Sequence, residues 1–198
     1  VDFEEGMRRT LEWYRKAQAP VVLGHEVSGQ VAAVGNEVRR YKEGDRVTAA
    51  HHVPCNACRS CLRGHHTLCP ILHRTSFDPG GFAEYVRLTP IHVEQGVFPV
   101  PDHMSYEEAV FVEPLACVLR GQRMAGLQEG DTVLVIGSGI TGILHMKLAR
   151  ALGAGRILAV DVSEHRLEAA RRLGANLALL ASEDVTTRVR EANDGRLA

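Results

Sequence analysis

The spacing of hydrophobic residues changes about halfway along the chain. Up to about residue 100, apolar residues form short runs separated by glycine, proline and charged residues, a pattern that predicts short β-strands. We expect strands within residues 21–34, from residue 44 onward, and at 83–88 and 97–100. Residues 4–16 instead have the helical spacing of an amphipathic helix. The first half is therefore expected to form a small, irregular β-barrel.

The second half contains longer and more regular segments. Residues 133–136 and 157–160 are continuous apolar runs, as expected for strands buried on both faces of a parallel sheet. A helical pattern follows each of them, and another precedes them from residue 106 to 119. A third strand is expected at 177–180 and a last helix at 184–191. Alternating strands and helices predict an α/β domain with a parallel sheet.

We place the boundary between the halves at residues 125 and 126, so residues 1–125 and 126–198 are the two expected domains. The 198 residues, 45% hydrophobic and 24% charged, describe an ordinary soluble protein able to build a core. A net charge of −1 offers no broad attraction to nucleic acid or to an anionic membrane. No apolar run is long enough to cross a bilayer, and the acidic N-terminus does not have the pattern of a signal peptide.

Four of the five cysteines form a cluster with the spacing C-x2-C-x2-C-x7-C: Cys55, Cys58, Cys61 and Cys69. Four thiolates so close in sequence can close a tetrahedral structural zinc site. Disulfides would need an oxidising compartment, which nothing here indicates. An iron–sulfur cluster of the bacterial ferredoxin kind has x3 before its last cysteine, not x7. The spacing therefore predicts zinc in a reducing cytosol, and the lone Cys117 is expected to be a small core residue.

A second group of candidate metal ligands is His25, Glu26 and Glu113. His25 and Glu26 lie in an apolar, glycine-framed strand, where the charged Glu26 needs a partner. Histidine and carboxylate are two of the three ligand types found in catalytic zinc sites. Glu113 stands before Pro114 in an apolar helical pattern. It either precedes a helix that starts at Pro114, where it favours the helix dipole, or is a third metal ligand.

The sequence Gly137-Ser138-Gly139-Ile140-Thr141-Gly142 has the pattern G-x-G-x-x-G between a strand and a helix. This context predicts a dinucleotide-binding turn, in which glycines let the backbone approach the pyrophosphate at the helix N-terminus. Gly137, Gly139, Ile140 and Gly142 are its candidate contacts. Asp161 ends the next strand and would bind the adenosine ribose, which favours NAD over NADP, and Arg166 would flank the adenosine. The alternative is a βαβ unit that binds no nucleotide.

Four motifs occur in one order: Gly24-His25-Glu26, the cysteine cluster, Glu113-Pro114-Leu115 and the glycine-rich turn. Over its whole length the chain resembles the zinc-containing medium-chain dehydrogenases, in particular the sorbitol (polyol) and threonine dehydrogenase branch. The resemblance implies a partial GroES-like irregular β-barrel domain followed by a partial α/β Rossmann domain with a parallel sheet. It also implies a structural zinc on the four cysteines and a catalytic zinc at His25, Glu26 and Glu113.

The resemblance further implies hydride transfer between a secondary alcohol or polyol and NAD, in a cytoplasmic homodimer or homotetramer. The alternatives are an L-threonine 3-dehydrogenase-like activity, or a non-catalytic structural-zinc fragment. Zinc-dependent nucleic-acid binding is disfavoured by the neutral charge balance and by the lack of a basic patch interleaved with aromatic residues. Zinc-free reductases of the same fold are disfavoured by His25-Glu26 and by the cysteine cluster.

The chain departs from this family at its start. The family takes a zinc ligand from a Cys-Gly-x-Asp motif roughly two dozen residues before the histidine, but no cysteine precedes Cys55 here. We expect Val1-Asp2 to be the tail of that motif, which makes the chain a fragment that is inactive by itself. Asp2 would then orient His25, a support that metal-bound histidines commonly have. Val1 stands where many relatives have a serine or threonine that relays the proton.

Overall fold

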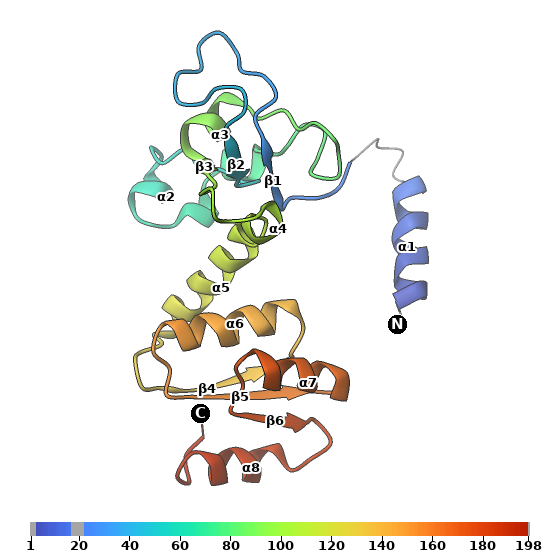
Figure 1. Cartoon of the computed structure of the whole chain (residues 1–198), viewed down its shortest axis with the longest axis vertical. Coiled ribbons are helices and arrows are strands. Elements are labelled where there is room, and N and C mark those ends of the chain that lie inside the picture. The colour runs from blue at the N-terminus through green and yellow to red at the C-terminus, as the bar shows by residue number, and fades with distance from the viewer. Residues whose placement is uncertain (1–2, 17–21, 198) are drawn as a thin grey trace. The chain divides into compact units, whose positions relative to one another are not determined.

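The computed structural model describes residues 3–16 and 22–197, and the chain packs as two units, Val1–Val110 and Phe111–Ala198 (Figure 1). The first unit contains a three-stranded sheet, and the second contains another. Helix α5, Val112–Ala125, belongs by its contacts to the second unit. The domain boundary expected at residues 125 and 126 stays a prediction. It differs from the division between the units by the placement of α5, which the expected boundary assigns to the first domain.

The sheet of the first unit is antiparallel. Its strands are β1 (Val27–Gln30), β2 (Arg46–Ala49) and β3 (Val97–Pro99), in the order β1-β2-β3. A small apolar cluster of Ala49, Phe77 and Val97 forms the core beside this sheet. The strands expected from residue 44 and at 97–100 are thus confirmed, while the one expected within 21–34 is limited to β1.

The remaining elements of the first unit are short, apart from α1 (Phe3–Lys16), which confirms the expected amphipathic helix. Long loops connect them, and most of the chain between β2 and β3 has no regular structure. The other helices are α2 (Arg59–Leu62), α3 (Pro90–Gln95), α4 (Tyr106–Ala109) and the 3-10 turns η1 (His66–Leu68) and η2 (Leu72–Arg74).

The strand expected at residues 83–88 is wrong. Only Arg87 pairs there, through a single bridge to Asp78. The preceding residues bond to a different segment: the N–H groups of Gly81 and Phe82 donate to the carbonyls of Gly24 and Leu23, both at 2.8 Å. The sequence has the apolar alternation of a strand. However, no neighbouring strand among the described residues forms a continuous series of backbone hydrogen bonds with these residues, which make only isolated backbone contacts.

The second unit is a parallel βαβαβ arrangement. Strands β4 (Thr132–Ile136), β5 (Arg156–Asp161) and β6 (Leu177–Leu180) pair in the order β4-β5-β6. Helices α6 (Ile140–Ala151) and α7 (Glu164–Leu173) cover one face of this sheet and α8 (Val185–Ala192) covers the other (Figure 1). The strands and helices expected from residue 133 onward are confirmed.

Two expectations for the segment around α5 are wrong. The helix expected over 106–119 is split into α4 and α5, and α5 begins at Val112, two residues before Pro114. Cys117 is exposed rather than in the core. The buried face of α5 is formed by Val118 and Gln122, which are four residues apart, and Cys117 lies off that face. Among the described residues, no helix is long and apolar enough to cross a membrane.

Candidate functional site

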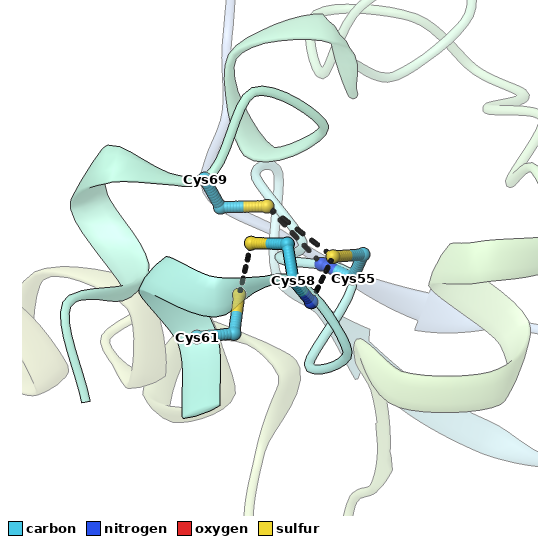
Figure 2. Close-up of side chains that lie close together, drawn as sticks. All are labelled: Cys55, Cys58, Cys61 and Cys69. Atoms are coloured by element: carbon cyan, nitrogen blue, oxygen red, sulfur yellow. Dashed lines mark hydrogen bonds between the residues drawn. The ribbon is translucent and has the colours of Figure 1, made fainter. Parts of the chain in front are cut away.

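The four clustered cysteines converge in the loop between β2 and α3 (Figure 2). Their sulfur atoms all lie within 4.8 Å of one another. The Sγ atoms of Cys58 and Cys61 are 3.5 Å apart, and those of Cys55 and Cys69 are 3.6 Å apart. Tetrahedral zinc with bonds of about 2.3 Å holds its sulfurs about 3.8 Å apart, whereas disulfide sulfurs are only about 2.05 Å apart. The geometry therefore fits four ligands of one zinc ion.

Local backbone hydrogen bonds favour the thiolate form of Cys69 in this cluster. The N–H of Cys55 donates to Cys69 Sγ at 3.4 Å, and the N–H of Cys58 donates to Cys55 Sγ at 3.3 Å. The first of these bonds is the main cause that lowers the pKa of Cys69 to about 6, whereas burial raises the pKa of Cys61 to about 12. Asn56, with φ of 52°, makes the left-handed turn that an asparagine tolerates.

His25 and Glu26 lie directly before β1, and both are exposed. Gly24 sets their position, because its φ is +95° and an added Cβ would lie 2.8 Å from the backbone nitrogen of Phe82. The segment is tied to Gly81, whose N–H donates to the Gly24 carbonyl at 2.8 Å. The backbone is thus fixed just before the two predicted ligands, and their side chains are left accessible.

Sequence reasoning did not identify His51, which lies beside His25, or His92, which contacts His51. The His51 ring packs edge-on against His25, with ring centroids 5.9 Å apart. Burial, and after it the neighbouring histidines, lower the pKa of His51. His92 is fully buried, and its Nε2 donates to the His51 carbonyl at 3.0 Å, while the Thr89 hydroxyl lies 2.7 Å from its Nδ1. His92 is therefore a structural residue that holds the backbone at His51.

Glu113 and Asp2 complete the predicted catalytic group. Glu113 is half-buried in the first turn of α5, in the second unit, and its Oε1 accepts a weak bond from Cys117 Sγ at 3.7 Å. Asp2, like Val1, lies outside the described residues. A common site for His25, Glu26 and Glu113 stays a prediction.

The glycine-rich turn lies between β4 and α6, as its motif predicts. Gly137 has φ of +97°, and a Cβ on Gly142 would lie 1.9 Å from the Gly137 carbonyl oxygen, so the turn closes only without side chains. Nothing lies within 4 Å of a Cβ added to Gly139, which leaves space above the backbone for a ligand. The first N–H groups of α6 have no helical partner and can bind an anion there.

An open pocket of about 590 Å³ adjoins this turn. Its lining combines the end of β4, the turn and the first turns of α6 with one cation from α7, Arg166. The lining residues are Val135, Ile136, Gly137, Gly139, Ile140, Thr141, Gly142, His145 and Arg166. Small residues, backbone N–H groups and an arginine at one opening suit a phosphate-containing ligand.

Asp161 is almost entirely buried at the end of β5. Its Oδ2 accepts from the Ser138 N–H of the turn at 2.7 Å and its Oδ1 from the Ser163 N–H at 2.9 Å. Burial raises the pKa of Asp161, but these bonds and the Arg166 charge, 3.8 Å away, outweigh it and leave the pKa below its usual value. The carboxylate therefore holds the turn, and each oxygen keeps a further lone pair for a ligand.

Sequence reasoning also missed a polar pair between α5 and α6. Gln122 is buried on α5, and its amide bonds to His145 of α6. The available signal was the position of each residue, since Gln122 and His145 are polar residues at core-facing spacing within otherwise apolar segments.

Comparisons with known proteins agree with this picture. Residues 1–102 match the alcohol dehydrogenase GroES-like domain, and residues 141–198 match the zinc-binding dehydrogenase family. The chain is 38% identical to a sorbitol dehydrogenase from Bacillus subtilis over 160 residues, which are 80% of this chain and 44% of that protein. The chain spans about half the length of the curated relatives it matches.

Solved structures show the same fold. A putative zinc-binding dehydrogenase from Clostridium scindens has a TM-score of 0.81 and 32% identity, covering 94% of this chain and 52% of the other. Another from Sinorhizobium meliloti, bound to NADP, has a TM-score of 0.74 and 29% identity, covering 85% and 49%. The predicted fold and, at the level of the family, the zinc and nicotinamide dinucleotide cofactors are thus confirmed. The chain belongs to the zinc-type medium-chain alcohol and polyol dehydrogenase family.

Proposed function

We propose that this protein is a zinc-dependent oxidoreductase that transfers a hydride between a secondary alcohol or polyol and NAD. One observation carries the proposal. A single chain of this family holds a four-sulfur cluster and, in its second unit, a glycine-rich turn clamped by a buried carboxylate beside a pocket. The first fits a structural metal ion and the second fits a dinucleotide.

We assign the metal ligands as follows. Cys55, Cys58, Cys61 and Cys69 hold the structural zinc. His25, Glu26 and Glu113 contribute to the catalytic zinc, and Asp2 orients His25. A catalytic zinc, when bound, supplies Lewis-acid chemistry that lowers the pKa of an alcohol. Support comes from the donor types, because histidine and carboxylate are ligands of open zinc sites, and from the exposure of His25 and Glu26.

For the dinucleotide, Gly137, Gly139, Ile140 and Gly142 approach the pyrophosphate, which lies at the N-terminus of α6. Asp161 accepts bonds from the adenosine ribose, and Arg166 flanks the adenosine. The lowered pKa of Asp161 keeps it charged at neutral pH, and a charged carboxylate repels a 2′-phosphate. The proposed preference for NAD over NADP rests on that repulsion, and the nearby Arg166 weakens it.

We place the protein in the cytoplasm, as a homodimer or homotetramer. The support for the location is chemical: all five cysteines are free thiols, and four of them are grouped as metal ligands. Such sites are typical of reducing compartments. The partner of the reaction is a small alcohol or polyol, and neither nucleic acid nor membrane is expected to bind.

The test measures zinc content, NADH binding and alcohol-dependent NAD reduction. We expect at least one tightly held zinc per chain, NADH binding, and NADH formation by the whole protein with a polyol or secondary alcohol. NADH formation with L-threonine but not with polyols or other secondary alcohols would instead support the L-threonine 3-dehydrogenase-like alternative. Zinc without any dinucleotide binding would favour the non-catalytic alternative, and a protein that holds no zinc would overturn the assignment of the cysteines.

A matched pair of glycine variants tests the proposed dinucleotide site directly. We expect Gly142→Ala to abolish NADH binding, because the new Cβ collides with the Gly137 carbonyl and opens the turn. Gly139→Ala meets nothing in the protein within 4 Å. It should therefore fold normally and weaken NADH binding only through contact with the ligand. Unchanged NADH affinity in both variants would contradict the proposed site.

A further inference from the structure

A buried polar contact joins α5 to α6 beside the nucleotide pocket. The Gln122 Nε2 donates to the His145 backbone carbonyl at 2.8 Å and lies 3.3 Å from His145 Nδ1. The Gln122 Oε1 is buried and has no hydrogen-bond partner within residues 3–16 and 22–197. An unpaired buried amide oxygen is unfavourable, so the presence of a glutamine here calls for a physical explanation.

Gln122 determines which nitrogen of His145 carries the proton. A carbonyl oxygen only accepts, so the amide must turn its NH2 group, and not its oxygen, toward the His145 carbonyl. The same NH2 group faces Nδ1, which is therefore the unprotonated nitrogen of the neutral ring. The proton of the neutral ring is then on Nε2. Burial also lowers the pKa of His145, so the ring stays neutral at pH 7.

The Nε2–H of His145 is a donor without an acceptor in the part of the chain that the structure describes. The ring lines the nucleotide pocket, and its Cε1 is the nearest atom to Gly121 of α5, 3.5 Å from where a Cβ would stand. Nδ1 and Cε1 are thus turned toward α5. Nε2 is therefore the ring nitrogen that can donate a hydrogen bond to a ligand.

The position of His145 indicates which half of a dinucleotide it meets. Asp161 and Arg166 belong to β5 and α7, on the adenosine side of the turn. His145 is one helical turn after Thr141, and its ring meets α5. A dinucleotide that leaves its adenosine at β5 and crosses the turn brings its second half toward this face of α6.

We propose that His145 donates a hydrogen bond from Nε2 to an oxygen in the second half of the bound dinucleotide, with Gln122 as the positioning residue that fixes the tautomer. The inference rests on the proposed dinucleotide site and adds a residue to it. It requires no metal ion, because neither His145 nor Gln122 is a proposed zinc ligand.

The test compares NADH and AMP binding by the wild-type chain, His145→Ala and the control Lys147→Ala, an exposed change on the same helix. We expect His145→Ala to weaken NADH about tenfold, the typical effect of one hydrogen bond to a charged or strongly polar partner. AMP, which has only the adenosine half, should bind all three proteins equally.

Each other outcome has a distinct meaning. If the wild-type chain binds neither NADH nor AMP, the proposed dinucleotide site fails and the inference fails with it. If wild type and His145→Ala bind NADH equally well, the site stands and the inference is overturned. A parallel loss of AMP binding would also overturn it, because His145 would then support the pocket rather than donate to the second half.

Nitrogen NMR of the imidazole tests the tautomer without relying on a variant that must fold. In the wild-type chain we expect the Nε2–H form, with the Nε2 signal shifted on addition of NADH. Gln122→Met keeps the volume of the side chain and removes the amide, so we expect a mixture of tautomers and about threefold weaker NADH binding. An Nδ1–H form in the wild type, or no response to NADH, would overturn the proposal.

Discussion

The two units of this protein achieve order in different ways. In the second unit, β5 has five consecutive buried residues, and helices cover both faces of its sheet. In the first unit, the apolar cluster beside the sheet has only three buried residues, and the loop around the cysteines has a few residues of helix and no strand. Instead of a large core, the first unit has polar anchors such as His92 and the four converging sulfurs.

The difference teaches where each unit gets its stability. Burial of apolar surface stabilises the second unit by about 25 cal/mol per Å², distributed over many side chains. Among the described residues, fewer apolar side chains are buried in the first unit than in the second. A metal ion that gathers four thiolates can therefore contribute a large share of the folding free energy of the first unit. The first unit should therefore depend on metal, and the second on its core.

The largest expected effect is that of removing one cysteine of the cluster. Cys69→Ser should abolish zinc binding at the cysteine lobe, residues 55–69, and unfold this lobe, because binding free energies of structural zinc sites are on the order of 10–16 kcal/mol in small peptides. Zinc content and regional hydrogen exchange measure this, and protection should disappear around residues 55–69 while β4, β5 and β6 stay protected. Cys117→Ser, at the exposed fifth cysteine, is the control and should change neither quantity.

A chelator should reproduce the effect of Cys69→Ser on the wild-type chain, with loss of zinc and of protection in the lobe. If the lobe keeps its protection after the metal is removed, the contrast between the two units is wrong. The loop would then be ordered by its own backbone contacts.

The next effect comes from a cavity in the second unit. Ile157→Ala removes a side chain that is 0% exposed and should cost about 2–5 kcal/mol in the free energy of unfolding. Ile136→Ala, at a side chain that is 81% exposed, should change it by less than about 0.5 kcal/mol. Urea unfolding followed through the second unit measures both. Loss of zinc in Ile157→Ala would show that the units are energetically coupled.

The smallest effect concerns the clamp on the glycine-rich turn. Asp161→Asn places an NH2 group against one of two backbone N–H donors and should cost about 1–3 kcal/mol at pH 7. Since the folded pKa of Asp161 lies below its usual value, its ionised form stabilises the fold above about pH 4. That contribution is lost as the pH falls through the folded pKa.

The stability of Asp161→Asn should therefore depend less on pH than that of wild type between about pH 4 and the folded pKa. Chemical denaturation at a series of pH values measures this difference. Parallel curves for the two proteins would show that the carboxylate does not hold the turn.

The same contrast explains how much could be predicted. Continuous apolar runs and helical spacing gave every strand of the second unit within a residue or two, because a strand buried on both faces leaves a continuous apolar signal. In the first unit, residues 83–88 have the sequence pattern of a strand, but they form only a single bridge, at Arg87. Short segments are decided by which backbone lies beside them, and a local pattern does not contain that information.

Site residues divide along a similar line. The convergence of the four cysteines and the glycine-rich turn were predictable because each lies in one short stretch, where spacing alone limits the geometry. Polar residues whose partner lies far along the chain could not be predicted in this way. His92 meets His51, and Gln122 meets His145, only after packing brings separate segments together.

The sequence alone determined the family, the two kinds of unit, the cluster of four cysteines and the glycine-rich turn, because these features are local in the chain. Tertiary structure decided that Cys117 lies outside the core, that Asp161 faces the turn as a clamp, and that Gln122 sets the tautomer of His145. The physical reason is the range of the interactions. Periodicity and spacing record contacts within a few residues, whereas burial and hydrogen-bond partners depend on the three-dimensional neighbours of each side chain.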